Sequence, residues 1–478
     1  MALWDLTDEE WFSRLNQKRL EQKWSGRKWW EYYDNEQPLA FVARILQEQE
    51  YRFPPLMIAW PELVIDSLEE RLDVEGFRLG DDDEASEALH DIWQWNDLDE
   101  ESEEAHLAAL VTSTSYVMVG PAEPYPKITI EYGDEVAVEV DPGTRRVVAG
   151  LKVWSSDGKI DNRGTLMLPG RLIEFELGKP VGSQSSRWSP AAESPQASPL
   201  VPLLPMLNRA RKSKGRSDLV AMRPLVDAAN QTATNLLAAV EHHALPRKYA
   251  IGVSKKDFVD EEGRQLPTWK VGTGAVWAVP GRPAQRGETP PQIELGQFPA
   301  SDLRNFIETI KLMAQTAASL YGLPQSYMGF VADNPASADS IRAAEARLIK
   351  RAERRQIRFG GTWERAMRIA WEMRGEGPAA ATRLETVWRD PATPTRAARI
   401  DAATKALQSG LADDEQARED AGYTAEQRRA MRRRAAENRN RISDDVRALD
   451  VTGVPDAASI LGGAGGPVPR QPAAGVPS

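Results

Sequence analysis

Apolar residues recur at helical spacing in three long segments of the chain. Residues 222–245 and 301–321 each predict a long helix, and Pro or Gly follows both of them. A third helix begins at Asn334 or at Ser337, since either residue can serve as an N-cap. Its apolar stripe continues to the end of the helix, and we expect a bend at the glycine pair that starts with Gly360.

Alternating apolar and polar positions over residues 127–177 predict short strands in an antiparallel meander. Residues 1–120 have mainly helical patterns and open with a capping box formed by Thr7 and Glu10. The Ser-, Pro- and Ala-rich stretch 181–202 predicts a loop. The pattern as a whole predicts an α+β fold that is mostly α.

Shorter elements are predicted between and after the long helices. Residues 246–299 contain strand-like pieces separated by turns, and residues 382–390 predict one more strand. Residues 395–439 predict three short helices, broken near Gly410 and Gly422. The Gly-, Pro- and Ala-rich end of the chain cannot bury a core and is expected to be disordered.

The helix predicted over 222–245 has an uncharged middle. No charged residue occurs from Ala228 to Val240, yet the segment is not simply apolar. Its polar residues are Asn230, Gln231, Thr232, Thr234 and Asn235. A helix that is neither charged on one side nor apolar all round predicts protein contacts on several sides and one wet, uncharged face.

Cations dominate the polar side of the third helix. They are Arg342, Arg347, Lys350, Arg351, Arg354, Arg355 and Arg358, against Glu345 and Glu353. Arg355 also interrupts the apolar stripe. The pattern favours a solvated or partner-facing side over a DNA reader, because no interleaved aromatic residues or base-reading Asn and Gln accompany it.

Composition limits the possible classes of protein. A chain of 478 residues exceeds what one core usually serves, so two or more packed units are expected. The net charge of -11 argues against a general nucleic-acid coat. The absence of cysteine excludes disulfides and makes the cytosol the default compartment. No signal peptide and no 18-residue apolar span is found, so no membrane partner is expected.

No catalytic, cofactor or metal site is assigned from the sequence. P-loop, H-E-x-x-H and G-x-S-x-G motifs are all missing, and we do not expect an enzyme. Acids crowd the stretch from Asp81 to Glu104, but an EF-hand spacing fails at Ala85 and Ser86. A solvated acidic surface is the favoured interpretation. A metal hydrolase built on these acids remains an open alternative.

The order of elements resembles the portal proteins of tailed bacteriophages, of the siphophage type. The resemblance extends over residues 5–445. Its most specific stretch is GLPQSYMGFVADNPASADSIRAAEARLIKRAERRQIRFGGTWERAMRIAW, supported by VPLLPMLNRARKSKGRSDL and by DPGTRRVVAGLKVW. This resemblance implies a ring, with twelve copies in the virion, at one capsid vertex. It also implies a virion location at the head-tail junction, after assembly in the host cytoplasm.

The resemblance implies a division of the chain into named parts. These are a wing at 1–221, a stem helix at 222–245, a clip at 246–299, a second stem helix at 300–321, a tunnel loop at 322–337, more wing at 338–394, a crown at 395–445 and a disordered tail at 446–478. It further implies double-stranded DNA, the terminase large subunit, the head-tail adaptor, and the major capsid and scaffold proteins as partners. The ATPase would then be the terminase, which agrees with the missing P-loop.

Two sets of residues are expected to line the channel. In the loop they are Gln325, Ser326, Tyr327, Met328, Gly329, Phe330, Asp333, Asn334 and Ser337, and in the stem Asn230, Gln231, Thr234 and Asn235. No Lys or Arg lies between Lys311 and Arg342, so the loop cannot hold phosphates. Tyr327, Met328 and Phe330 are expected to pack against neighbouring copies, and the basic helix against acids of the adjacent subunit.

One alternative remains for the C-terminal helices. Residues 395–441 could form a sequence-specific DNA-binding module, because helices with a cluster of Arg residues can read a groove. A compact helical subdomain with a charged rim is the favoured interpretation of the same pattern.

Overall fold

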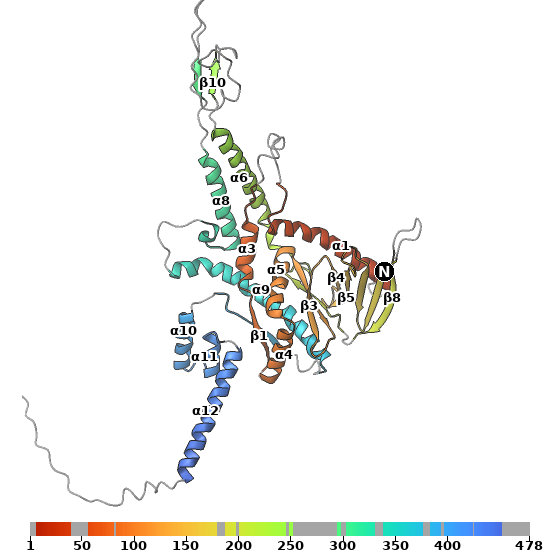
Figure 1. Cartoon of the computed structure of the whole chain (residues 1–478), viewed down its shortest axis with the longest axis vertical. Helices are drawn as coiled ribbons and strands as arrows, with labels where there is room; N and C mark the ends of the chain where they lie inside the picture. The colour runs from red at the N-terminus through yellow and green to blue at the C-terminus, as the bar shows by residue number, and fades with distance from the viewer. Residues whose placement is uncertain are drawn as a thin grey trace, which may run out of the picture. The chain divides into compact units, whose positions relative to one another are not determined.

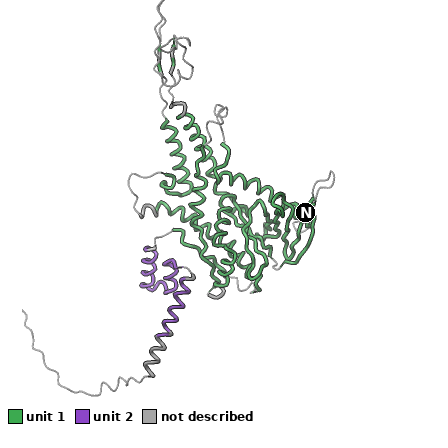
Figure 2. Tube along the Cα trace, in the orientation of Figure 1, with its two compact units in different colours: residues 1–393 green, residues 394–478 purple. Residues whose placement is uncertain are grey.

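The chain forms two compact units, residues 1–393 and 394–478 (Figure 2). The computed structural model describes residues 6–39, 56–80, 83–178, 187–196, 200–244, 248–251, 294–297, 303–329, 338–375, 383–392, 396–423 and 425–451. The protein belongs to the α+β class, and helices predominate in it.

Seven α-helices of the described residues belong to unit 1 (Figure 1). They are α1 (Asp8–Tyr33), α3 (Trp60–Glu69), α4 (Asp83–Trp95), α5 (Leu98–Thr112), α6 (Arg223–Ala244), α8 (Arg304–Tyr321) and α9 (Ala338–Met373). The helices predicted over 222–245 and 301–321 are confirmed, and they lie side by side as α6 and α8. None of the helices in the described part of the chain is long and apolar enough to cross a membrane.

A five-stranded antiparallel sheet confirms most of the predicted meander. Its strands, in spatial order, are β4 (Val136–Val140), β5 (Val147–Trp154), β6 (Arg163–Leu168), β7 (Arg171–Leu177) and β8 (Trp188–Pro195). The strand β8 contradicts the predicted loop over 181–202. Its residues are almost all exposed, and an edge strand with one exposed side tolerates proline, so the usual alternation of apolar and polar residues is missing.

The described part of the N-terminal 120 residues is mainly helical, as predicted, but it also contains two strands. β2 (Thr114–Gly120) pairs with β3 (Lys127–Glu131) on one side and with β9 (Leu203–Leu207) on the other. β1 (Val74–Leu79) pairs with β12 (Leu384–Trp388), which confirms the strand predicted at 382–390. The pairs β2 with β9 and β1 with β12 join strands far apart in sequence, so local patterns give little sign of their pairing.

A short antiparallel pair follows α6 in the chain. It consists of β10 (Lys248–Ile251) and β11 (Glu294–Gln297), within the segment expected to form the clip. The rest of that predicted segment lies outside the described residues.

The main core of unit 1 gathers around α9. Phe359 and Trp363 are fully buried on it, beside His106 of α5. The Trp363 indole donates a hydrogen bond to Nε2 of His106 over 2.9 Å. Burial lowers the pKa of His106 to about 3, so the imidazole is neutral and can accept this bond. A side chain at Gly360 would come close to Trp388 and Thr386, which explains the glycine there. The expected bend of α9 at this position stays a prediction.

The N-terminal helix α1 begins with the predicted capping box. Thr7 Oγ1 accepts a hydrogen bond from the backbone N–H of Glu10, while the Glu10 carboxylate accepts one from the N–H of Thr7. The helix then packs Phe12 against Phe175 of β7, with ring centroids 4.3 Å apart. This contact fixes α1 to one face of the five-stranded sheet.

Unit 2 contains the three predicted short helices, one of them longer than expected. They are α10 (Arg396–Gln408), α11 (Asp414–Asp420) and α12 (Ala425–Val451). α12 continues past the predicted start of the disordered tail at residue 446. Its residue Arg428 forms ion pairs with Glu415 at 3.4 Å and Glu419 at 2.9 Å of α11. Part of the Arg cluster therefore stabilises the unit itself.

Candidate channel loop and its anchor

The predicted tunnel loop begins where α8 ends. Gly322 adopts a left-handed conformation with φ of 71° and closes the helix through a hydrogen bond from its N–H to Ala318. A Cβ at Gly322 would lie 2.7 Å from the Arg347 side chain of α9, so the position needs glycine for both reasons. The 3-10 turn η4 (Gln325–Met328) follows at once.

Two side chains of this turn are engaged within their own chain. The Tyr327 hydroxyl donates a hydrogen bond to Glu345 over 2.8 Å and accepts one from Arg71 over 3.4 Å. Burial, followed by the bond to Glu345, raises the pKa of Tyr327. Met328 is buried in the main core. Both side chains therefore have contacts within their own chain, and the expected packing against neighbouring copies stays a prediction.

The other predicted loop residues fall into two groups. Gln325, Ser326 and Gly329 are exposed, and Gly329 has a φ of 83°. Phe330, Asp333, Asn334 and Ser337 lie outside the described residues. The described part of the loop therefore exposes neutral polar groups and backbone, close to the packed side chains of Tyr327 and Met328.

The predicted stem residues also divide into two pairs. Asn230 and Thr234 are 1% and 4% exposed. Asn230 Oδ1 accepts a hydrogen bond from the N–H of Ile58 over 2.9 Å, and Thr234 Oγ1 accepts one from the N–H of Leu56 over 3.3 Å. These two side chains hold the segment before α3 rather than contacting solvent.

Gln231 and Asn235 form the second pair, one residue further along the helix. Both side chains are partly exposed. They lie one turn apart on the same side of α6, because residues four apart are neighbours on a helix. Of the four predicted stem residues, these two remain accessible in the single chain.

A buried aspartate, which the sequence prediction missed, anchors the loop region. Asp218, in the 3-10 turn η2 (Asp218–Val220), has a fully buried side chain. Its carboxylate binds Arg355 over 2.9 Å, Arg351 over 3.3 Å and Arg209 over 3.3 Å. Burial alone would raise the pKa of Asp218, but Arg355, Arg351 and Arg209 together hold it below its usual value.

The same cluster reaches the end of α8. The Tyr321 hydroxyl donates a hydrogen bond to the backbone oxygen of Asp218, and the guanidinium of Arg351 lies over the Tyr321 ring at 4.8 Å from its centroid. Arg347 donates to the backbone oxygen of Ser319 over 2.7 Å. Four parts of the chain therefore meet at Asp218: the segment at Asn208, η2, α8 and α9.

These contacts account for two cations of the basic helix. Arg351 and Arg355 pair with an acid of their own chain, while the expected pairing of the other cations with an adjacent subunit stays a prediction. The signal that could have revealed this is Arg355 itself, since a cation inside an apolar stripe requires a buried acceptor. The sequence does not say which of the many acids supplies it.

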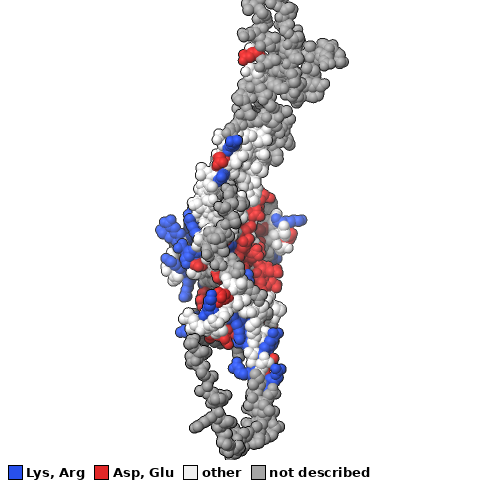
Figure 3. Space-filling view, turned by 90° about the vertical axis from the view of Figure 1, so that its left-hand side faces the viewer, with Lys and Arg blue, Asp and Glu red and all other residues white. Residues whose placement is uncertain are grey.

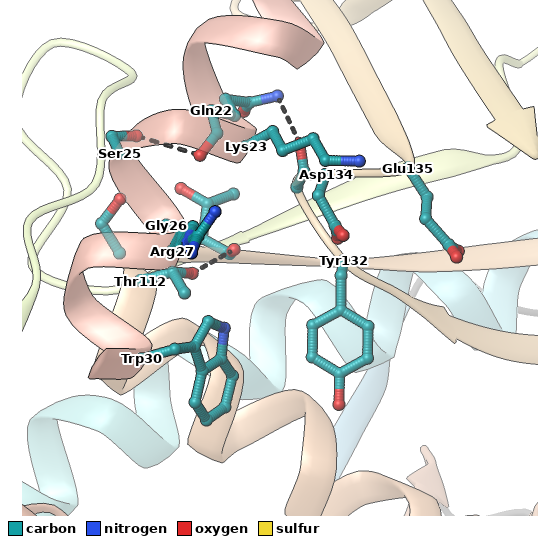
Figure 4. Close-up of a pocket in the computed structure, with 13 residues that line it drawn as sticks. Gln22, Lys23, Ser25, Gly26, Arg27, Trp30, Thr112, Tyr132, Asp134 and Glu135 are labelled. Atoms are coloured by element: carbon teal, nitrogen blue, oxygen red, sulfur yellow. Dashed lines mark hydrogen bonds between the residues drawn. The ribbon is translucent and has the colours of Figure 1, made fainter. Parts of the chain in front are cut away.

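One cavity of unit 1 lies between α1 and the start of the sheet and has a volume of about 410 Å³ (Figure 4). Lys23 from α1 faces Asp134 and Glu135 from the turn before β4. The hydrogen bonds there are structural, such as that from Gln22 to the backbone oxygen of Gly133 over 3.5 Å. The lining shows no nucleophile held by a base.

No metal site is assembled either in the portion of the chain that the structure describes. There, no group of three or more His, Cys, Asp and Glu side chains could hold an ion. The metal-hydrolase alternative therefore gains no support from the acids of α4 and α5.

Comparisons with known proteins define the class. The model of the family described as "Phage portal protein, SPP1 Gp6-like" matches residues 13–444. The chain belongs to this family of phage portal proteins. It is similar to the portal protein of Mycobacterium phage L5, with 35% identity over 421 residues, covering 84% of this chain and 83% of the relative. For the portal protein of Mycobacterium phage D29 the identity is 35% over 394 residues, covering 79% and 78%.

Solved structures give a weaker likeness. One is the neck of a native GTA particle computed with C12 symmetry, at 16% identity, a TM-score of 0.40 and coverage of 75% of this chain and 89% of that one. A second is the virion of a native gene transfer agent particle, at 14% identity and a TM-score of 0.40, covering 81% and 95%.

Proposed function

We propose that copies of this portal protein form a ring of twelve at one capsid vertex and that viral DNA passes through it during packaging and ejection. The observation that carries the proposal is the hairpin of α6 and α8, which is followed by a loop whose first residues include no Lys or Arg. A polyanion slides past such a surface, because each phosphate that a protein neutralises adds affinity. The wing, stem, clip, tunnel-loop and crown divisions belong to this proposal.

The described residues that we assign to the channel wall are neutral. In the stem these are Gln231 and Asn235, and in the loop Gln325, Ser326 and Gly329. Asn230 and Thr234 support the wall from behind, because their side chains are buried against residues 56–58. The undescribed loop residues Phe330, Asp333, Asn334 and Ser337 are kept in the proposal on the family resemblance.

Neighbouring copies would cover the apolar side chains exposed on the stem. Leu237 and Val240 of α6 are 43% and 45% exposed, and Ile307 and Leu312 of α8 are 55% and 64% exposed. An exposed cluster of this kind favours contact with another protein surface. Burying it between adjacent hairpins would stabilise the ring.

The proposed role is structural rather than catalytic. The terminase large subunit would supply the ATPase, and the head-tail adaptor, major capsid and scaffold proteins would be further partners. No cofactor and no membrane is involved. The ring would reside in the virion at the head-tail junction after assembly in the host cytoplasm. The pairing of Arg428 within unit 2 speaks against a sequence-reading DNA-binding role.

Electron microscopy of the purified full chain tests the proposal. We expect closed rings with a central hole, and DNA packaging should depend on them. A protein that stays monomeric even with its capsid and scaffold partners would contradict it. Specific binding of one DNA sequence by the full chain would instead favour the alternative function of the C-terminal helices.

A further inference from the structure

α3 and α9 pack against each other through their apolar sides. Ile65 and Leu68 of α3 belong to the same core as Leu348 and Ala352 of α9, and α3 passes in front of α9 in Figure 1. When two helices bury facing sides, their outer sides point in opposite directions. The polar residues of the two helices therefore lie on opposite flanks of unit 1.

The outer side of α3 is acidic. Glu62, Asp66 and Glu69 recur at i, i+4 and i+7, so they form one stripe. We define the acidic face as Glu62, Asp66, Glu69, Glu70 and the neighbouring Glu103 of α5. Within the described ranges, no Lys or Arg pairs with Glu69, Glu70 or Glu103. Burial, and after it the charge of Glu103, raises the pKa of Glu69 to about 8.

The outer side of α9 is basic. We define the basic face as Lys350, Arg354, Ile357, Arg358 and Arg365, all of them exposed. Lys350 pairs with Glu353 of the same helix over 2.5 Å, whereas none of the described acids pairs with Arg354 or Arg358. Ile357 is 79% exposed in the middle of these cations. Cations around an exposed isoleucine favour an interface over a surface that stays in water.

The two faces lie at the same level of unit 1. Figure 3 is turned by 90° from Figure 1, and beside the stem base it shows Lys and Arg gathered on the left and Asp and Glu on the right. A second copy placed alongside the first, without a shift along the vertical axis, would bring one face to the other. A contact of this kind joins two different surfaces, and its repetition gives a ring when the rotation between copies closes.

We propose that the acidic face of each copy docks on the basic face of the next copy around the ring. This inference rests on the proposed function, since it presupposes the ring. The second copy is the occupant that the charges select, because the chain itself carries both complementary surfaces at one level. Docking would cover Ile357 and neutralise the acids of α3. It also assigns to Arg354 and Arg358 the role that Arg351 and Arg355 cannot have.

Charge reversal tests the pairing. One variant carries Glu70→Lys and Glu103→Lys, both at exposed acids, and the other carries Arg354→Glu and Arg358→Glu. In each variant alone, the two reversed charges meet like charges of the opposing face, so we expect its ring fraction to fall by about tenfold or more, measured by electron microscopy and light scattering. Mixed in equal amounts, the two variants should form rings of alternating subunits. A chain with all four substitutions should also form rings.

A control matches the number and sign of the reversed cations. Lys127→Glu with Lys159→Glu reverses two exposed cations outside both faces, and this variant should assemble as the wild type does. Circular dichroism reports whether each variant is folded. Restoration of rings in the mixture gives the same answer independently, since an unfolded variant cannot be rescued by a second one.

The outcomes separate this inference from the proposed function. If the wild type never forms rings, the proposed function fails. If the wild type forms rings and the two reversed variants also do, or if mixing them restores nothing, the pairing of the faces is wrong. Binding of a short DNA duplex that is lost with Arg354→Glu and Arg358→Glu, while rings persist, would show DNA to be the occupant of the basic face and overturn the inference.

Discussion

Arg354 and Arg355 are consecutive in sequence but face different surroundings on α9. Arg355 is 8% exposed and binds Asp218, whereas Arg354 is exposed and lies outside the cluster. The helical period alone separates them, because one residue turns the helix by about 100°. The arginines of α9 therefore belong to two surfaces. One holds the subunit together, and the other is available to a partner.

Removing the buried member should have the largest effect. Arg355→Ala leaves Asp218 buried with one cation fewer, and we expect the free energy of unfolding to fall by about 3–5 kcal/mol. Arg354→Ala is the matched control and should change it by no more than about 0.5 kcal/mol. Urea unfolding of both variants measures the difference. Equal effects would mean that the two arginines do not differ as described.

The same contrast exists within the stem. Asn230→Ala leaves the partly buried N–H of Ile58 without its acceptor, which should cost about 1 kcal/mol of unfolding free energy. Gln231→Ala, its neighbour on the accessible side, should leave stability nearly unchanged. Urea unfolding monitored by circular dichroism distinguishes them. A larger loss in the Gln231 variant would refute the assignment of Asn230 to the supporting side.

A similar effect is expected at the start of the loop. Tyr327→Phe removes the hydrogen bond to Glu345 but keeps the ring, so stability should fall by about 0.5–1.5 kcal/mol. Hydrogen exchange of residues 325–329 should become faster in this variant. Exchange identical to that of the wild type would show that the hydroxyl does not hold the turn. Ser326→Ala provides the control on an exposed neighbour.

Substitution of Glu69 in the acidic face should change stability in a way that depends on pH, with the smallest effect at low pH. The pKa of Glu69 is raised to about 8, above its value in the unfolded chain, so its stabilising contribution is full below about pH 4.5 and is lost as the pH rises through 8. Glu69→Gln should remove this loss in the monomer. Its melting temperature should match that of the wild type near pH 4.5 and exceed it at pH 9. A constant difference at every pH would argue against a raised pKa.

Local patterns predicted much of the fold and less of the anchor. Periodicity located α6, α8 and α9 because each buries one continuous side. It could not locate β8, whose exposed residues carry no alternation. The interruption of the apolar stripe at Arg355 could have indicated a buried acceptor, but its partner Asp218 lies 137 residues away and is found only through tertiary contacts. Periodicity also could not tell that Asn230 faces residues 56–58 and Gln231 does not.

The contacts of Arg351 have a mechanical consequence. Its guanidinium touches both the Tyr321 ring and Asp218, so the C-terminal end of α8 is held against α9. A tilt of α8 would therefore move α9 with it. A change of angle in the hairpin of α6 and α8 would reach α9 directly through these side chains, without transmission through a loop.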